Sequence, residues 1–250
     1  MRLSVLFLVL IFFVSFASAV IPDDCDSSMV AFWRMEGNAN DSYKYGYNGT
    51  ASAGVAYNDN IITKAAVFNG ANKITVSNSA INEVFKSRFT LEFWMQTGDT
   101  LTGSLVRGGT DNNKFSVGID NNRLVVNASG VKLNSSTLTN PRNYFVAVVY
   151  DSSGSNISLY VDNVRVDSKT ITSAPSFTGN LVIGEGFIGL IDEVALYNRT
   201  LEESVVISHY LLGSSNQLAE RKDYCNIDGS KTQAILYDCI DPDYPFEAYL

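Results

Sequence analysis

The chain has 250 residues, of which 46% are hydrophobic and 18% are charged. This length and composition fit one large β-rich domain, since all-β sandwiches commonly exceed about 200 residues, and they exclude a coiled coil or a disordered chain. The formal net charge of −8 does not provide the basic face that nucleic-acid binding requires, so we expect no nucleic-acid partner.

The N-terminus has the three parts of a secretory signal peptide. A basic residue, Arg2, is followed by an apolar run at residues 3–16 and by a small-residue cleavage site that ends at Ala19. The apolar run is shorter than the roughly 20 residues that a membrane-spanning helix needs. We therefore expect a signal peptide at residues 1–19 and a mature chain that is secreted or displayed at the cell surface, with no membrane span.

Short strands separated by turns dominate the mature chain. The first is expected at residues 29–35. Residues 64–70 and 73–77 then flank Asn69-Gly70, which predicts a hairpin. In residues 89–96, polar and apolar positions alternate, with Phe89, Leu91, Phe93 and Met95 on one face. Further strands are expected at residues 104–107, 114–119, 123–127, 143–150, 157–162, 164–169 and 180–183.

The last predicted strand, at residues 186–197, is apolar on both faces and should be covered on both sides. Strict alternation places Asp192 in one row with Leu190 and Val194. A carboxylate in such a row costs several kcal/mol or more unless it is paired, hydrogen-bonded or metal-bound. A helix should follow, with Thr200 and Glu203 as a capping box and Gly213 as its stop.

Five segments follow one another along the chain: AFWRMEGNANDSYKYGYNGT, KAAVFNG, KITVS, FTLEFWMQ and GFIGLIDEVALYNRTLEESVV. In sequence and in order they resemble the laminin-G-like (concanavalin A-like) jelly-roll family. The resemblance covers residue 29 to about residue 212. It implies an all-β fold: a two-sheet antiparallel β-sandwich (jelly roll) with one short C-terminal helix. We expect this domain at residues 27–213 and a separate tail at residues 214–250.

Three cysteines, Cys25, Cys225 and Cys239, allow one disulfide at most. A jelly roll brings its ends close together, which favours a Cys25–Cys225 disulfide across the domain. The alternative, Cys225–Cys239, would close a small loop in the tail. Neither spacing matches a zinc site.

An oxygen-rich loop follows the first strand, and the family often binds structural calcium in this region. First and last strands are neighbours in a jelly roll, so Asp192 should approach this loop. We therefore expect Ca²⁺ as a structural cofactor, held by Glu36, Asp41 and Asp192, because calcium prefers hard oxygen ligands. The alternative is that Asp192 accepts hydrogen bonds from backbone N–H groups of the Asp41 loop while Glu36 is exposed.

Tyr43, Tyr45 and Tyr47 stand where the family has small polar residues. If the stretch is extended, the three rings lie on one side and suit stacking on sugars or contacts with a protein. This predicts a ligand-binding surface. The alternative is that the rings only cover the edge of the sandwich.

Catalytic patterns are missing from the sequence. Retaining glycosidases of this shape need two facing carboxylates, whereas Asp192 and Glu193 are adjacent and should point to opposite faces. The single histidine, His209, is expected on a solvated helix surface, and no cysteine has a base partner.

We therefore expect a non-catalytic secreted or cell-surface module that binds carbohydrate or a surface protein. One alternative is a structural or adhesive component that self-associates. Another, which the sequence disfavours, is a polysaccharide-degrading glycoside hydrolase of the same fold.

Overall fold

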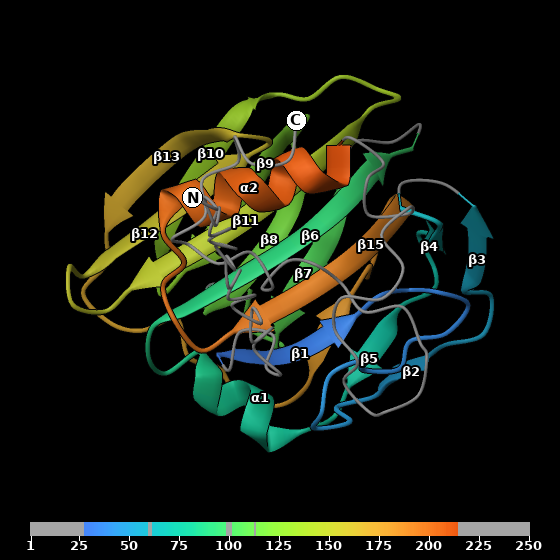
Figure 1. Cartoon of the computed structure of the whole chain (residues 1–250), viewed down its shortest axis with the longest axis horizontal. Coiled ribbons are helices and arrows are strands. Elements are labelled where there is room, and N and C mark those ends of the chain that lie inside the picture. The colour runs from blue at the N-terminus through green and yellow to red at the C-terminus, as the bar shows by residue number, and fades with distance from the viewer. Residues whose placement is uncertain (1–27, 60–61, 99–101, 113, 215–250) are drawn as a thin grey trace, which may run out of the picture.

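The computed structural model describes residues 28–59, 62–98, 102–112 and 114–214, which form two antiparallel β-sheets packed face to face (Figure 1). The predicted all-β jelly-roll sandwich is thereby confirmed. The predicted signal peptide, the cysteines Cys25, Cys225 and Cys239, and the tail from residue 215 lie outside the described residues.

The larger sheet has eight strands within the described ranges. In spatial order they are β13 (Val164–Thr170), β12 (Asn156–Val161), β11 (Asn143–Asp151), β6 (Phe89–Thr97), β15 (Ile188–Tyr197), β4 (Lys64–Asn69) and β3 (Ala56–Asp59), with β1 (Met29–Trp33) also paired to β15. The first and last strands are therefore neighbours, as predicted.

The smaller sheet has seven strands in the same described part of the chain. Their order is β10 (Val131–Thr137), β9 (Arg123–Ala128), β8 (Phe115–Asp120), β7 (Gly103–Gly108), β14 (Leu181–Ile183), β5 (Ile74–Val76) and β2 (Gly49–Ala51). Strands β2, β3 and β10 were not predicted. The first two are short and mostly exposed, so they lack a hydrophobic pattern.

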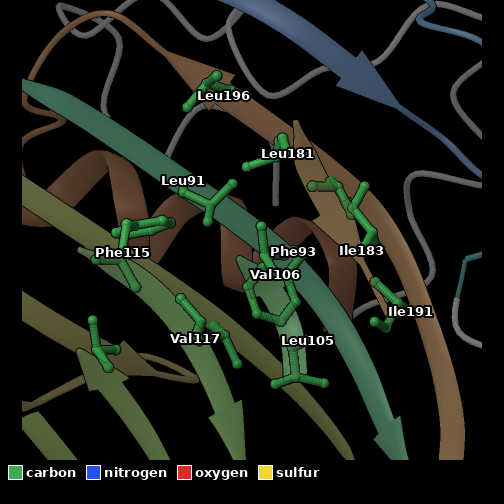
Figure 2. Close-up of a cluster of buried hydrophobic side chains, with 14 of the residues drawn as sticks. Leu91, Phe93, Leu105, Val106, Phe115, Val117, Leu181, Ile183, Ile191 and Leu196 are labelled. Carbon is green, nitrogen blue, oxygen red and sulfur yellow. The ribbon is translucent and has the colours of Figure 1, made fainter. Parts of the chain in front are cut away.

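The side chains between the two sheets form the inter-sheet core (Figure 2). Strands β6 and β15 contribute residues such as Leu91, Phe93 and Ile191, and β7, β8 and β14 contribute residues such as Leu105 and Phe115. These five side chains have no exposed surface. Each contributes about 1.5–3 kcal/mol on burial. The predicted core row of β6, from Phe89 to Met95, is confirmed.

Helix α2 (Glu203–Ser214) lies across the other face of the larger sheet (Figure 1). It covers a second apolar group, the outer cluster, which includes Trp94, Phe145, Tyr197 and Val206. Gly213 allows the close approach of this helix, because a Cβ there would lie 2.4 Å from the Trp94 ring.

The start of α2 differs from the prediction. The helix begins at Glu203, and the first helical hydrogen bond runs from the N–H of Val206 to the carbonyl of Glu202. Thr200 does not cap it, because its hydroxyl donates to the Tyr150 carbonyl at 3.1 Å. Gly213 is not the stop, since the helix includes Ser214.

A second helix, α1 (Ser79–Val84), connects the two sheets between β5 and β6 and was not predicted. Its N-cap is Asn78, whose side chain accepts a hydrogen bond from the N–H of Ala80 at 2.9 Å. The helix is one and a half turns long, too short to show a helical period in the sequence.

The hairpin predicted at Asn69-Gly70 is wrong, because β4 and β5 belong to different sheets. Gly70 takes the required left-handed turn at φ +86°, but its N–H donates to the Phe187 carbonyl at 2.8 Å. The buried side chain of Asn72 completes the corner: it accepts from the N–H of Asn69 at 2.9 Å and donates to the Gly54 carbonyl at 2.6 Å.

A β-bulge interrupts β15 at Glu193, where φ is +50°. Asp192 pairs with Trp94 and Ala195 with Glu92, so two residues of β15 oppose one residue of β6. The alternation of faces is reset there. Leu190 joins the outer cluster while Val194 joins the inter-sheet core, so the predicted single row is wrong.

Candidate functional site

Asp41 shapes the loop at residues 41–48, here named the tyrosine loop, between β1 and β2. Its Oδ1 accepts hydrogen bonds from the N–H groups of Phe32 and Tyr43, both at 2.9 Å, and its Oδ2 accepts from the N–H of Tyr47 at 2.8 Å. Burial raises the pKa of Asp41, although these N–H groups oppose the shift. One carboxylate thus holds the loop in a turn, so the loop is not extended.

The three predicted tyrosines contact one another in this loop. The rings of Tyr43 and Tyr45 meet edge to face with centroids 5.8 Å apart, and those of Tyr45 and Tyr47 stack at 5.6 Å. Tyr43 is buried in the outer cluster, whereas Tyr45 has 51% of its surface exposed. The Lys44 ammonium lies 5.1 Å from the centre of the Tyr45 ring. Tyr45 and Lys44 therefore form the accessible part, and ligand binding there stays a prediction.

The three predicted calcium ligands do not converge on one point. Asp41 uses both oxygens for backbone N–H groups of its own loop and of β1. Asp192 is fully buried and accepts from the N–H groups of Ile62 at 3.0 Å and Glu193 at 2.9 Å. Glu36 accepts from the Thr63 hydroxyl. Within the described ranges, no three Asp, Glu, His or Cys side chains are placed to hold a metal ion together.

A partly buried group of charges lies at the β15 bulge. The sequence predicted that Asp192 approaches Glu36, whose charge acts on it in the structure, but it did not predict the part of Arg34 and Glu193. We name Arg34, Glu36, Asp192 and Glu193 the acid–arginine cluster. Arg34 Nε lies 3.6 Å from Glu193 Oε1, and Arg34 Nη2 lies 4.0 Å from Glu36 Oε1. Burial raises the pKa of Glu193 from 4.5 to about 8. Burial and the charge of Glu193 raise the pKa of Asp192 well above its usual value. The adjacent acids were visible in the sequence, but the bulge was not.

Calcium binding through the predicted ligands Glu36, Asp41 and Asp192 stays a proposal. If the ion binds there, a hundredfold excess over Kd stabilises the domain by about 2.7 kcal/mol and raises its Tm by about 5–10 °C. The Asp192→Asn variant should lose the shift, while the exposed-site control Glu83→Gln should keep it. Thermal melts with calcium and with chelator test this, and identical Tm values in both would contradict calcium binding.

His209 is buried, so the prediction of a solvated helix-surface histidine is wrong. Its Nδ1 lies 2.7 Å from Glu92 Oε2, and both side chains are almost fully covered. Glu92 has an alanine on each neighbouring strand, Ala147 on β11 and Ala195 on β15. These small residues leave room for the imidazole to reach from α2 into the sheet.

The outward face of the smaller sheet has a polar hollow of about 420 Å³, here named the sheet groove. Strands β7, β8 and β9 line it with Ser104, Arg107, Gly118 and Asn127, and Glu185 follows from the end of β14. No motif predicted it, because its residues come from separate strands that also contribute to the core.

Sequence comparison identifies the family. The laminin-G-type model described as the concanavalin A-like lectin/glucanases superfamily matches residues 68–206, more than half of the chain. The chain belongs to this superfamily. The resemblance seen in the sequence is therefore confirmed. No curated protein matches the chain in sequence.

Solved structures share the superfamily fold. Domain 4 of AbnA, an extracellular GH43 arabinanase from Geobacillus stearothermophilus, in complex with arabinotriose, has a TM-score of 0.57 and 21% identity; the match covers 72% of this chain and 97% of the domain. The binding domain of Paraclostridial Mosquitocidal Protein 1 has a TM-score of 0.62 and 18% identity; the match covers 75% of this chain and 52% of that chain.

A third similar structure is of botulinum neurotoxin type C, whose cell entry is described as dependent on interaction with two ganglioside molecules. Its TM-score is 0.61 and its sequence identity is 17%. The match covers 77% of this chain and 52% of the toxin chain. The chain thus spans about half the length of the toxin chains that it matches. At these sequence identities, the structural similarity establishes a shared fold but not a shared function. None of the helices in the described ranges has the length and apolar character needed to span a membrane.

Proposed function

We propose that the domain is a non-catalytic carbohydrate-binding module that uses the tyrosine loop. The single observation that carries this is the contact of the three rings, with Tyr45 exposed and Lys44 beside it. Asp41 fixes the loop before any ligand arrives, which lowers the entropy lost on binding. An aromatic face with a polar tip suits the apolar face of a sugar ring and its hydroxyls.

The comparisons support sugar binding without naming the sugar. One similar structure is a complex with arabinotriose, and another belongs to a toxin whose entry depends on gangliosides. A protein partner at the cell surface is the second candidate ligand, since one similar toxin binding domain is in complex with synaptotagmin II. The proposed setting is extracellular or at the cell surface, because the N-terminus has a signal-peptide pattern.

The placement of the acidic side chains favours a binding function over a catalytic one. A hydrolase needs two carboxylates that reach the substrate across about 5–10 Å. Asp192 and Glu193 are covered by protein. In the sheet groove, Lys73 and Arg107 hold the pKa of Glu185 below its usual range, which is opposite to what a general acid requires.

A glycan-array screen of residues 20–250, run with calcium and again with chelator, tests the proposed function. We expect specific glycan binding and a loss of about tenfold in affinity for Tyr45→Ala, equivalent to about 1.4 kcal/mol. Val164→Ala serves as a matched control, because Val164 is also an exposed hydrophobic residue but lies on β13. If the wild type binds no glycan on the array, or if Tyr45→Ala binds as well as the wild type, the tyrosine-loop proposal is overturned.

A further inference from the structure

The tyrosine loop turns its negative charge inward and its positive charge outward. Asp41 is the only acidic residue of the loop, and its two oxygens accept hydrogen bonds from three backbone N–H groups. Lys44 is exposed, and no carboxylate in the described part of the chain forms an ion pair with it. The surface of the loop therefore has a cation without a counter-charge.

The neighbouring rings hold the Lys44 ammonium in place. It lies 5.3 Å from the centre of the Tyr43 ring and 5.1 Å from the centre of the Tyr45 ring. Both distances are within the range of a cation–π attraction, which extends to about 6 Å. This attraction keeps a long, flexible side chain beside the exposed ring of Tyr45 before any ligand binds. A sugar that stacks on Tyr45 is therefore within reach of the ammonium.

The crowding of the Tyr45 ring separates neutral sugars from acidic ones. Tyr47 already stacks on this ring at 5.6 Å, and Lys44 lies over it. A neutral sugar that displaces Lys44 loses the cation–π attraction, which corresponds to about two- to fivefold in affinity. A sugar with an anionic group replaces this attraction with a charge-assisted hydrogen bond, which is about twice as strong as a neutral one.

A second hydrogen-bond donor lies at the end of the loop. The Oδ1 atom of Asn48 accepts from the N–H of Asp41 at 3.0 Å, which fixes the orientation of the side-chain amide. Asn48 is exposed, so its amide NH₂ group can donate to a ligand. The loop thus offers an ammonium and an amide donor, and both suit carboxylate or sulfate oxygens.

We propose that the tyrosine loop selects acidic sugars, which carry a carboxylate or a sulfate group, with the Lys44 ammonium as the recognition group. This inference rests on the proposed function, because it names the class of sugar that the same loop binds.

The test is an NMR titration of the ¹⁵N-labelled chain of residues 20–250 with matched pairs of sugars that differ in charge. The pairs are sialyllactose and its methyl ester, trigalacturonate and its methyl ester, and sulfated lactose and lactose. We expect the acidic member of at least one pair to shift the amide signals of Lys44, Tyr45 and Tyr47, with an affinity about tenfold above that of its neutral counterpart. Carboxylate and sulfate probes distinguish the two kinds of acidic group.

The titration separates this inference from the proposed function. If the neutral member of each pair shifts the loop signals with the same affinity as the acidic member, sugar binding stands and the selection of acidic sugars is overturned. If no member of any pair shifts these signals, both the inference and the tyrosine-loop function are overturned.

Variants of Lys44 test its role. Because the side chain is exposed, Lys44→Gln should keep the wild-type Tm. It should lose about tenfold in affinity for the acidic sugar, with unchanged or up to about fivefold higher affinity for the neutral one. Lys44→Arg should retain the preference, and so should the control Lys114→Gln, which removes the same charge from an exposed lysine between β7 and β8. A preference for acidic sugars that survives in Lys44→Gln would contradict the assigned role of Lys44.

Discussion

Raising the pH from about 4.5 to about 8 is expected to lower the free energy of unfolding by about 5 kcal/mol through Glu193 alone. The folded-state pKa of Glu193 is about 8 against 4.5 in the unfolded chain, and each unit corresponds to about 1.4 kcal/mol. In this window the folded state holds a proton that the unfolded chain has released. The contribution is therefore fully present below pH 4.5 and is lost as the pH rises through 8.

The Glu193→Gln variant should lack this loss of stability. Urea unfolding of both proteins across the window gives the comparison, with Glu83→Gln as the control because its side chain is 65% exposed. Asp192 contributes in the same direction, since its pKa is also raised. A wild-type stability curve that does not fall across this window, or one that the Glu193→Gln variant reproduces, would show that burial in the acid–arginine cluster does not raise the pKa of Glu193.

Replacing His209 with leucine is expected to destabilise the domain by about 3–5 kcal/mol, because it leaves Glu92 buried without its partner. The second oxygen of Glu92 already lacks a hydrogen-bond partner within the described residues. The double variant His209→Leu/Glu92→Leu removes the buried carboxyl group as well and should recover much of the loss. Chemical denaturation measures the free energy of unfolding of the wild type, of each single variant (His209→Leu and Glu92→Leu) and of the double variant.

Ser204→Ala is the matched control for this experiment, since it changes an exposed residue of the same helix. A loss below about 1 kcal/mol in His209→Leu would mean that Glu92 is satisfied without the imidazole. An equal loss in the Glu92→Leu background would mean that packing of the imidazole, and not its bond to Glu92, attaches α2 to the sheet.

Strands with a clear period were predictable because their pattern reflects one buried face. The row from Phe89 to Met95 matches the structure. The pairing of β1 with β15 matches it too, but that prediction came from the resemblance to the jelly-roll family and not from the pattern. The dipeptide Asn69-Gly70 shows where prediction from local sequence fails. It does turn the chain, but the dipeptide alone cannot distinguish a hairpin within one sheet from a crossing between two sheets. That choice depends on the distant carbonyl of Phe187.

The site was less predictable, because it depends on irregular backbone and on residues far apart in sequence. The left-handed conformation of Glu193 leaves no signature in a residue type that rarely adopts it. The burial of His209 depends on two alanines from other strands. The tyrosine triplet was found because its spacing is local, but its turn depends on hydrogen bonds that the Asp41 carboxylate accepts and that the spacing does not specify.

The central place of β15 has a consequence for how the polypeptide acquires its structure. This strand is the last one in the described chain, yet it lies between β6 on one side and β1 and β4 on the other. Until it emerges from the ribosome, the larger sheet is divided into two halves with unpaired edges. Such long-range pairing slows folding and exposes strand edges to aggregation. We therefore expect productive folding to begin only after synthesis has passed Tyr197.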